Sequence, residues 1–409
     1  MKTVGIIAEY NPFHNGHCYQ IKKAKEITGA DFVVVLMSGN FVQRGTPAIV
    51  DKYTRTSMAL EGGADMVFEL PSFYATSSAE AFAYGGISIF HKLGFIDEIC
   101  FGCETPDLSL LEAIADLLLK EPTEYTKTLT AYHKQGLSYP AARQKALLAY
   151  FEQYPIEHVS SAQLTSCIEQ PNNILAIAYI QALKALDSSI QPIPIQRTDN
   201  GFHNTEIEGT LASATAIRKE CLKGKQLQSL KSAVPPYVLT GLHSQWQKTF
   251  PITEDDFSSL LYYKLQQETD YTKYADITKD FSNKLQKTFS FHQTFTTLVE
   301  QLKTKDLVYT RICRNLLHIL LGITKEEPKW EPEYVRLLGF KKSSSSLLKK
   351  TEAISVITKV ADAKKLLSEN GYSHFQKDIL CSHLYNHICY EKYGYHCKSE
   401  YEQGPIILS

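Results

Sequence analysis

The sequence contains no long hydrophobic run, and none of its apolar stretches approaches the roughly 20 residues that a membrane-spanning helix needs. The N-terminal stretch MKTVGIIAEY leads into a Pro-Phe-His turn rather than into the small residues of a cleavage site, which argues against a secretory signal. These two absences argue against a membrane protein and against an exported one. We therefore expect a cytoplasmic protein.

The sequence also has almost no net charge, because 43 Lys and Arg side chains offset 44 Asp and Glu side chains to give −1. Any surface for a nucleic acid must therefore be local. The nine cysteines are odd in number and scattered, which suits reduced thiols better than a disulfide framework. Near the C-terminus lie Cys381, His383, His387, Cys389, His396 and Cys397. His383 and His387 have the H-x₃₋₅-H spacing of a zinc site, but the set does not fit a complete site cleanly, so we interpret the cysteines as helix-core residues and the histidines as positions of an amphipathic helix.

A regular alternation of strand and helix patterns fills the first 105 residues of this 409-residue chain. Strands are expected at 3–10, 31–38, 66–70 and 98–103, with a last strand at 190–197. Helices are expected at 17–27, 51–62, 77–93 and 107–120, and then at 140–154 and 172–186. Strict alternation predicts an α/β fold with a Rossmann-like, doubly wound parallel sheet that carries helices on both faces.

The second half of the chain has a different pattern. Pro235-Pro236 mark a plausible boundary, so we divide the chain into an α/β domain at 1–230 and a mainly α-helical domain at 231–409. Apolar residues recur at helical spacing in 257–266, 307–321 and 347–367.

The segment NPFHNGH, residues 11–17, follows the first strand, at the sheet edge where parallel sheets bind ligands. Pro12 ends the strand, and Gly16 lets the backbone approach a ligand closely. His17 opens a helix whose free N–H groups favour phosphate. The rings of His14 and His17 have N–H groups that can stabilise a phosphate during displacement, so the loop is predicted to be a phosphate clamp.

A second element, SATAIR at residues 213–218, begins a helix about 200 residues later. Ser213 or Thr215 can cap this helix, and the guanidinium of Arg218 can make charge-assisted contacts with a polyphosphate. Taken alone, the segment fits an ordinary capped helix with a surface arginine better than a ligand site.

Together, HNGH and SATAIR resemble the two signatures of the HxGH nucleotidyltransferase superfamily. A closer resemblance is to the bacterial tRNA(Met) cytidine acetate ligase family, through VGIIAEYNPFHNGH, MSGNFVQRGTPAIVDKYTR, GADMVFELP, FGCE, PNNILAIAY and SATAIR in this order. It is strong over residues 1–220 and weaker through YTRICRNLLHILLGI and YVRLLGF. It implies an enzyme that activates acetate with ATP as acetyl-adenylate and passes the acetyl group to N4 of the wobble cytidine of elongator tRNA(Met), without acetyl-CoA. Its partners would be acetate and the anticodon loop.

The resemblance also implies roles for individual residues. The first domain would bind ATP and carry catalysis, with His14, His17, Arg218 and Lys52 as the catalytic residues, and the second domain would contribute to tRNA binding. The residues expected to contact ATP are Ile7, Ala8, Glu9, Tyr10, Asn11, Pro12, Phe13, His14, Asn15, Gly16, His17, Gln20, Gly102, Asn173, Arg197, Ser213, Thr215 and Arg218. Asn172 would cap its helix as well as Asn173 does.

The cation that would hold acetate is left open by the sequence. Acetate is a small anion and needs a cation or backbone N–H groups near the α-phosphate, which Lys52 or Arg44 could supply. In the alternative interpretation Asp51 caps a helix, and Lys52 and Arg55 are solvated. Mg²⁺ on the departing pyrophosphate is expected on general grounds, although no carboxylate ligand stands out.

Contacts with RNA are expected from Arg311 and Arg314, and from Lys341 and Lys342 beside a serine-rich turn. Such charges also fit solvated helix faces. Two other functions remain open: an adenylyltransferase for a phosphorylated metabolite, and a non-catalytic RNA-binding protein on a nucleotide-binding fold. The extra helical half argues against the first alternative, and the intact histidines and Arg218 argue against the second.

Overall fold

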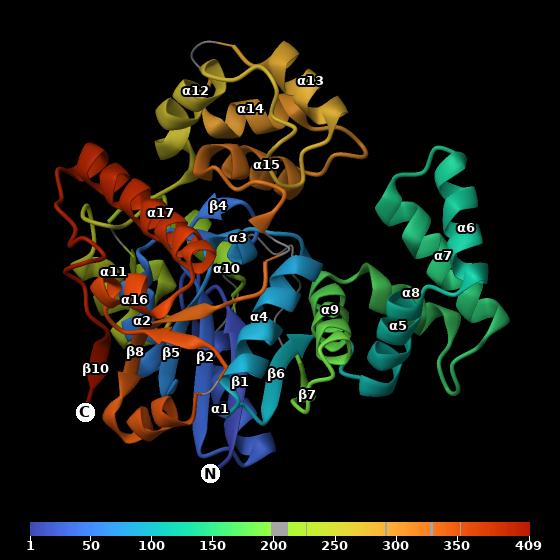
Figure 1. Ribbon diagram of the computed structural model, residues 1–409, viewed down its shortest axis with the longest axis horizontal. Coiled ribbons are helices and arrows are strands. Elements are labelled where there is room, and N and C mark those ends of the chain that lie inside the picture. The colour runs from blue at the N-terminus through green and yellow to red at the C-terminus, as the bar shows by residue number, and fades with distance from the viewer. Residues whose placement is uncertain (198–211, 226, 291–292, 328–329, 352) are drawn as a thin grey trace.

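The computed structural model describes residues 1–197, 212–225, 227–290, 293–327, 330–351 and 353–409. An eight-stranded sheet lies at its centre, with the order β10-β8-β5-β2-β1-β6-β7 and with β9 paired to β8 (Figure 1). The strands of this sheet are β1 (Thr3–Ala8), β2 (Phe32–Ser38), β5 (Met66–Leu70), β6 (Glu98–Cys103), β7 (Gln191–Gln196), β8 (Tyr334–Lys341), β9 (Ser355–Ile357) and β10 (Ile406–Leu408).

The five strands from the first half of the chain form the predicted parallel sheet. β1 pairs in parallel with β2 and β6, β2 with β5, and β6 with β7. Along β2, Val33 and Val35 pack into one hydrophobic cluster, whereas Val34 and Leu36 pack into another. Successive side chains of a strand point to opposite faces. Both faces of the sheet are therefore covered, which is typical of doubly wound folds and confirms the predicted fold class.

Helices cover the two faces in pairs. On one face lie α1 (Asn15–Thr28) and α2 (Lys52–Glu61), and on the other lie α4 (Ala79–Leu93) and α9 (Pro171–Ala185). Gly5 of β1 lets α4 pack closely, because a Cβ atom at this position would lie 2.7 Å from Cε2 of Phe90.

The second half of the chain contributes to the same sheet, which the sequence did not predict. β8 pairs antiparallel with β5, and β9 and β10 pair in parallel with β8, so the sheet is mixed rather than wholly parallel. The stretch 347–367, expected to be helical, instead contains a 3₁₀ helix (Lys342–Lys350), β9, a second 3₁₀ helix (Val360–Asp362) and the short α16 (Ala363–Leu366). The division at residue 230 stays a prediction, since the sheet takes strands from both sides of it.

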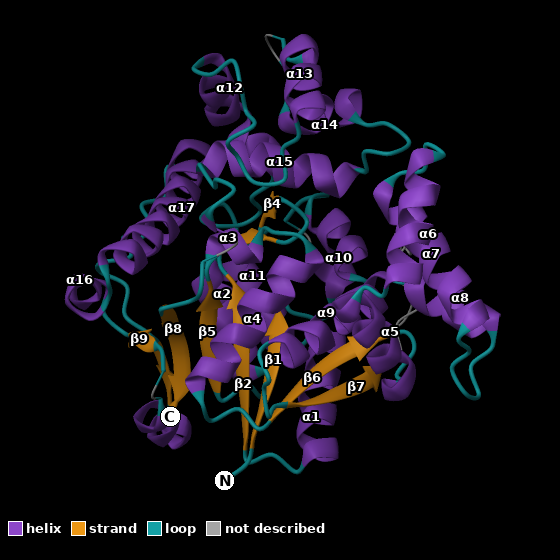
Figure 2. Ribbon diagram, turned by 45° about the vertical axis from the view of Figure 1, so that its right-hand side comes forward, coloured by secondary structure: helices purple, strands orange, loops and turns teal. Residues whose placement is uncertain are grey.

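Two groups of helices stand away from the sheet (Figures 1 and 2). We call the first the arm; it consists of α5 (Leu108–Lys120), α6 (Thr123–Lys134), α7 (Tyr139–Gln153) and α8 (Ser161–Glu169). We call the second the cap; it consists of α12 (Ser258–Gln266), α13 (Lys279–Thr288), α14 (Phe295–Leu302) and α15 (Tyr309–Leu321). The other helices are α3 (Ser72–Ala75), α10 (Ala214–Cys221), α11 (Pro236–Ser244) and α17 (Glu369–Tyr393). No described helix combines the length and apolarity needed to cross a bilayer.

Candidate active site

A cavity of about 300 Å³ opens where β1, β6 and β7 end and where α1 and α10 begin. Most of the residues predicted to contact ATP line it: Ile7, Ala8, Glu9, Tyr10, Asn11, His14, Gly16, His17, Gln20, Gly102, Arg197, Ser213, Thr215 and Arg218. The two sequence elements 200 residues apart therefore meet in one cavity. Its walls carry two imidazoles and the guanidinium groups of Arg44, Arg197 and Arg218, which suits an anionic ligand.

The two histidines cap the first helix reciprocally. The backbone N–H of Gly16 donates to Nδ1 of His14 at 3.1 Å, and the backbone N–H of His14 donates to Nδ1 of His17 at 3.2 Å. Their rings are stacked with centroids 3.6 Å apart. Because each Nδ1 accepts a hydrogen bond, the proton of each neutral ring belongs on Nε2. Both imidazoles are thereby oriented as Nε2–H donors.

His17 is kept neutral by its surroundings. Burial, followed by the neighbouring His14 and Arg197, lowers the pKa of His17 well below its usual value. Its ring packs edge-on against Tyr10, with centroids 4.7 Å apart. A neutral imidazole donates a hydrogen bond without adding a second cation beside Arg197.

Arg218 enters the cavity from the first turns of α10. Ser213 caps this helix through the backbone N–H of Ala216 at 3.1 Å. The guanidinium of Arg218 donates to the carbonyl oxygen of Asn11 at 2.9 Å and to Oγ1 of Thr215 at 3.2 Å. Burial, followed by the nearby Arg44, lowers the pKa of Arg218. The cation is thus tied directly to the phosphate-clamp loop that contains both histidines.

Four of the predicted ATP contacts do not line the cavity. Phe13 is fully buried beside Tyr10, with ring centroids 4.8 Å apart, and Pro12 precedes it in the loop. Asn15 faces away, since its Nδ2 donates to the carbonyl oxygen of Ser232 at 2.8 Å. These three residues shape the loop rather than its ligand surface.

The fourth of these residues, Asn173, is replaced in the cavity wall by its neighbour Asn172. Asn173 is fully buried, and its Oδ1 accepts hydrogen bonds from the backbone N–H groups of Glu104 and Thr105, both at 3.0 Å. Asn172 lines the cavity and accepts a hydrogen bond from Arg197 at 3.2 Å. The two residues are adjacent at the start of α9, and only the phase of the helix decides which one faces the ligand.

This correction predicts different defects for two neighbouring substitutions. Asn172→Ala should weaken ATP binding by about tenfold through the loss of one or two hydrogen bonds, with little effect on stability. Asn173→Ala should instead destabilise the protein by about 1 to 3 kcal/mol, because two buried N–H groups lose their acceptor. Calorimetric titration with ATP and urea denaturation would measure the two effects. Equal effects of both substitutions on ATP affinity would contradict the assignment.

Lys52 does not reach the cavity, which corrects its predicted catalytic role. It opens α2, but its side chain is only 1% exposed. Its Nζ lies 2.8 Å from each carboxylate oxygen of Glu69, 3.1 Å from Oε2 of Glu400 and 2.9 Å from Oγ of Ser382. Two carboxylates thus neutralise this charge inside the protein, and Arg336 also pairs with Glu400.

Arg55 is likewise not solvated, contrary to the alternative interpretation, although Asp51 does cap α2. Its side chain is fully buried and donates to the carbonyl oxygens of Glu9 at 2.7 Å and Ser38 at 2.9 Å, and to that of Gly39. The guanidinium joins the chain just beyond β1 to the end of β2. It therefore fixes the backbone that forms one wall of the cavity.

Asp378 lies beside this buried network and predicts a pH effect on stability. It accepts hydrogen bonds from the Tyr334 hydroxyl at 2.5 Å and from the backbone N–H of Ser72 at 2.7 Å. Burial, followed by the charge of Glu69, raises the pKa of Asp378 from 3.8 to about 6. Because the folded-state pKa lies above the unfolded value, this group stabilises the fold below about pH 4 and loses that contribution as the pH rises through about 6.

Asp378→Asn, which does not titrate, should remove this loss. Urea denaturation at about pH 4 and at about pH 7 should show the variant gaining roughly 2 to 3 kcal/mol relative to the wild type at the higher pH. A stability difference that is the same at both pH values would refute the effect.

Arg44, the other cation considered for acetate, does line the cavity. It lies between β3 (Phe41–Val42) and β4 (Thr46–Pro47), which form a separate two-stranded sheet. The next residue, Gly45, has φ +80°, and a Cβ atom there would collide with the backbone nitrogen of Arg314 in α15. The loop that carries Arg44 is therefore packed directly on the cap.

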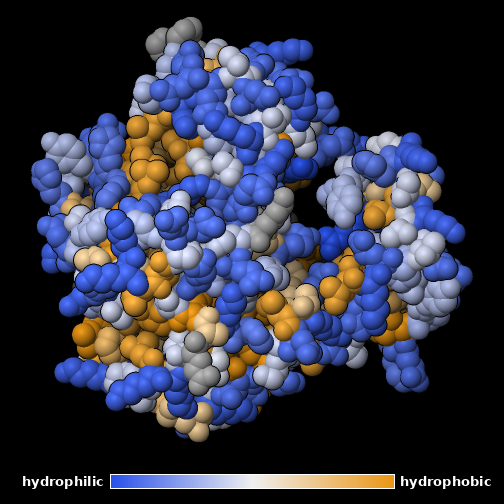
Figure 3. Space-filling model, viewed as in Figure 1, coloured by the Kyte–Doolittle hydropathy of each residue, from blue (hydrophilic) through white to orange (hydrophobic). Residues whose placement is uncertain are grey.

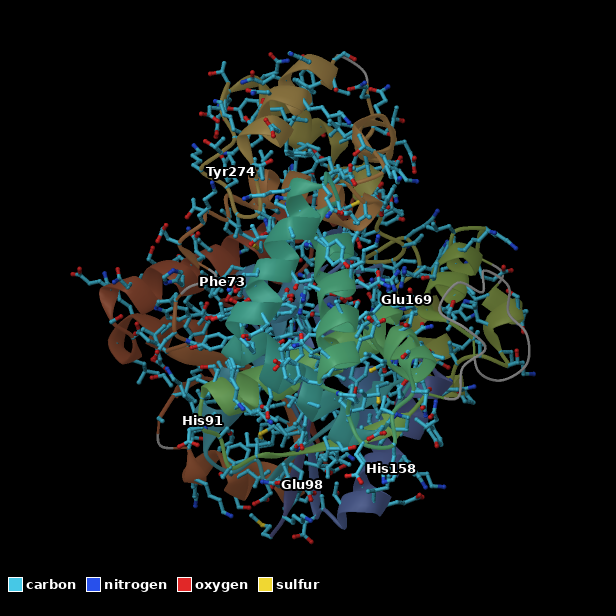
Figure 4. The ribbon with its side chains drawn as sticks, turned by 90° about the vertical axis from the view of Figure 1, so that its right-hand side faces the viewer. Phe73, His91, Glu98, His158, Glu169 and Tyr274 are labelled. Atoms are coloured by element: carbon cyan, nitrogen blue, oxygen red, sulfur yellow. The ribbon has the colours of Figure 1, made fainter. Side chains whose placement is uncertain are left out.

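The four residues predicted to contact RNA lie at opposite ends of the molecule. Arg311 and Arg314 are partly buried near the start of α15, on the side where the Arg44 loop packs, and Arg314 pairs with Asp276 at 3.8 Å. Lys341 ends β8, where it pairs with Asp65 at 3.5 Å, and Lys342 follows it. Because β8 runs antiparallel to β5, both lysines lie near the N-terminal edge of the parallel strands, about 20 Å from the edge with the cavity. In Figure 4, Glu98 at the start of β6 and Tyr274 between α12 and α13 mark these two ends of the molecule.

Sequence reasoning missed several lining residues. Phe101 and Gln196 line the cavity and directly precede Gly102 and Arg197 in the chain. The predictions for Gly102 and Arg197 were therefore the signal that could have indicated them. Phe82 and Tyr179 enter from the faces of α4 and α9, and no local pattern indicated which helix face would meet the cavity. The sequence indicated Gln43 only through its position after the second strand, next to Arg44, which was already a candidate for the cation that holds acetate.

Comparisons with known proteins agree with this geometry. A family model described as HIGH Nucleotidyl Transferase matches residues 1–400. The tRNA(Met) cytidine acetate ligase of Thermoanaerobacter sp. (strain X514) is 39% identical over 391 residues, covering 94% of this chain and 95% of that protein. The protein of the same name from Clostridium novyi (strain NT) is 36% identical over 418 residues and covers 100% of both chains.

Solved structures extend the likeness to the whole fold. Thermotoga maritima TmcAL without ligand superposes with a TM-score of 0.93 at 27% identity, and both chains are covered completely. The same protein bound with alpha-thio ATP superposes with a TM-score of 0.91.

Proposed function

The chain belongs to the tRNA(Met) cytidine acetate ligase family, within the HIGH nucleotidyltransferases, and from this premise we propose that it couples acetate to elongator tRNA(Met) at the expense of ATP. The product would be N4-acetylcytidine at the wobble position of the anticodon. The observation that carries the proposal is the convergence of His14, His17 and Arg218 on one cavity at the carboxyl edge of the sheet. Relatives of this name match nearly the whole chain, including the residues that form the arm and the cap.

ATP would lie with its phosphates between the N-terminal ends of α1 and α10. The N-terminal end of each helix carries a partial positive charge that favours an anion. At α1 the ring N–H groups of His14 and His17 would donate to the phosphates, since the backbone N–H groups of Asn15, Gly16 and His17 already have acceptors within the protein. The adenosine would extend toward Gly102, Asn172 and Arg197, where β6 and β7 end. A side chain at Gly102 would press on Arg197, because its Cβ atom would lie 3.1 Å from Cγ of that residue. The T. maritima relative is bound with alpha-thio ATP, which supports ATP as the ligand.

Mg²⁺ would arrive with ATP and balance charge on the departing pyrophosphate. Such an ion needs few protein ligands, because Mg²⁺ at nucleotide sites keeps several waters and binds substrate phosphates. The described residues contain no cluster of three metal-ligating side chains, and this fits an ion held mainly by the triphosphate.

The first chemical step would be attack of an acetate oxygen on the α-phosphorus, with pyrophosphate as the leaving group. Charge builds on the phosphate oxygens in this step. The Nε2–H groups of His14 and His17 and the guanidinium of Arg218 are the donors that would stabilise this charge. No nucleophile from the protein is required. The second step would be attack of the cytidine amine on the activated carbonyl of acetyl-adenylate, with AMP as the leaving group.

Acetate would be held by Arg44 rather than by Lys52. Arg44 lines the cavity and is close enough to Arg218 to lower its pKa, so the two cations share one region of the site. A second guanidinium beside the α-phosphate would bind the carboxylate of acetate and reduce its repulsion from the triphosphate.

The anticodon loop would approach from the side of α15 and the arm. The reacting cytidine must reach acetyl-adenylate in the cavity, so it must leave the stack of the loop. Arg311 and Arg314 lie on this side, near the Arg44 loop, whereas Lys341 and Lys342 lie at the far edge of the sheet. In the view of Figure 3 a dark gap lies between the cap and the arm.

The proposal is tested by incubating the protein with ATP, acetate and unmodified tRNA, followed by mass analysis of the nucleosides. Acetylcytidine that depends on both ATP and acetate is the expected result. AMP transfer to a phosphorylated metabolite without acetylcytidine would favour an adenylyltransferase. RNA binding without turnover of ATP would favour a non-catalytic protein.

A further inference from the structure

One acidic side chain stands among the cations of the cavity. Among the lining residues that the structure describes, Glu9 is the only carboxylate, and it shares the wall with Arg44, Arg197, Arg218 and the histidines. A carboxylate repels the phosphates of ATP, so its position directly after β1 requires another purpose. Its charge acts on Arg218, on Arg55 and on the Tyr179 hydroxyl, whose pKa is raised by burial and then by Glu9.

The position of Glu9 is rigid. Its carbonyl oxygen accepts a hydrogen bond from buried Arg55 at 2.7 Å, which fixes the backbone. Its Oε1 accepts a hydrogen bond from the backbone N–H of Gln43 at 2.9 Å, which fixes the side chain against the loop that carries Arg44. Oε2 has no hydrogen-bond partner among the described residues. It does not belong to the fully buried polar atoms that lack a partner, so this oxygen is accessible. Because Glu9 lines the cavity and only one of its oxygens is engaged, Oε2 remains available to a ligand.

We propose that Glu9 binds the N4 amine of the target cytidine through Oε2 and accepts its proton during acetyl transfer. This inference rests on the proposed function. The amine nitrogen attacks the carbonyl carbon of acetyl-adenylate and forms the new C–N bond. The C–O bond to the phosphate breaks, and AMP leaves with the electron pair. The proton that the nitrogen loses passes to the carboxylate of Glu9 and from there to solvent.

The same contact selects the base. A carboxylate accepts a hydrogen bond from N4 of cytosine, whereas uracil presents a carbonyl oxygen at this position, which the carboxylate repels. Uridine at the wobble position would therefore bind poorly as well as lack a nucleophile. The carboxylate thus serves both recognition and proton removal, and neither role involves the triphosphate.

The test separates the two chemical steps in the full-length protein. Acetate-dependent ATP–pyrophosphate exchange reports adenylate formation, and single-turnover acetylation of an unmodified tRNA(Met) transcript reports transfer. Glu9→Gln is the informative variant, since its amide oxygen still accepts the Gln43 N–H but removes no proton. Glu9→Asp keeps the carboxylate on a shorter side chain and is the matched partner. Trapping of the adenylate by hydroxylamine, a nucleophile that needs no protein base, gives a third measurement.

Because Glu9 also lines the ATP cavity, exchange by the Gln variant is the reference against which its transfer is judged, and measurable exchange and hydroxylamine trapping show that the variant is folded and forms the adenylate. Its transfer to tRNA should fall by about 100-fold or more, the usual range for loss of a general base. The rate of transfer in the Asp variant should lie between the rates of the wild type and the Gln variant. Unchanged transfer in the Gln variant would overturn the proposal, and so would a parallel loss of exchange, which would make Glu9 a Mg²⁺ or ATP ligand. If the wild type showed neither exchange nor acetylation, the proposed function would be refuted, and this inference with it.

Discussion

Arg218→Met should lower the rate of acetate-dependent ATP–pyrophosphate exchange by about 100- to 1,000-fold, the usual effect of removing one preorganised donor from a developing anion. The guanidinium is held by Asn11 and Thr215 before any ligand arrives, so its position costs no reorganisation during the reaction. Methionine has a similar length and packs well, so the free energy of unfolding should change by less than about 1 kcal/mol. Exchange kinetics and urea denaturation of the same preparation measure both quantities.

Arg218→Lys is the matched control. It keeps the positive charge but loses the planar fork that can serve Asn11 and a phosphate at once, so it should recover only part of the rate. A Met variant that exchanges at the wild-type rate would show that Arg218 does not contact the reacting phosphate. A Met variant that unfolds would be uninformative about catalysis, and the Lys variant would then decide the question through its exchange rate.

Lys52→Met should destabilise the protein by about 3 to 5 kcal/mol, because it leaves the buried carboxylates of Glu69 and Glu400 without one of their cations. Arg336 still pairs with Glu400. Within the described residues, Glu69 forms a salt bridge with Lys52 alone. Urea denaturation would measure the loss. The fraction that remains folded should form acetyl-adenylate at the wild-type rate, because Lys52 does not line the cavity.

Lys23→Met provides the comparison. Lys23 is 40% exposed at its side chain and pairs with Glu26 at 3.6 Å, and such surface pairs contribute less than about 1 kcal/mol. The stability of this variant should therefore match that of the wild type. If Lys52→Met instead kept full stability and lost exchange, the sequence-based prediction of a catalytic lysine would be reinstated.

The parts of the fold that follow local rules could be predicted from the sequence. The first parallel strands and their crossover helices were recognised from β-branched runs alternating with helical patterns. The start of α1 was recognised from NPFHNGH. The helix expected at 17–27 is observed at Asn15–Thr28. It begins two residues earlier than expected, because His14 is its N-cap and forms a capping box with His17.

The missed features depend on distant partners. Strand β8 is a short apolar run, YVRLLGFK, within a mainly helical half, and a run of this kind has no periodicity that separates strand from helix. Only its pairing with β5, about 270 residues earlier in the chain, makes it a strand. Lys52 was misassigned for the same reason, since its partners Ser382 and Glu400 lie more than 300 residues away along the chain.

The candidate site was predictable where residue type alone carries the chemistry. Imidazoles, a guanidinium and glycines at strand and helix ends indicated a phosphate site, and the structure brings these residues together. Side-chain direction was not predictable, because it depends on helix phase. Asn172 and Asn173 differ by one position in α9, and this rotation turns one into the cavity and the other into the core.

The central claim, that acetate attacks the α-phosphorus of ATP in this cavity, is tested most directly with acetate labelled by oxygen-18 in both carboxylate positions. The protein would be incubated with labelled acetate, ATP and tRNA(Met), and the nucleotide products would be weighed by mass spectrometry. Attack through an acetate oxygen predicts AMP that carries one oxygen-18 atom for each acetyl group transferred. AMP without label, or ADP as the labelled or unlabelled product, would contradict the account.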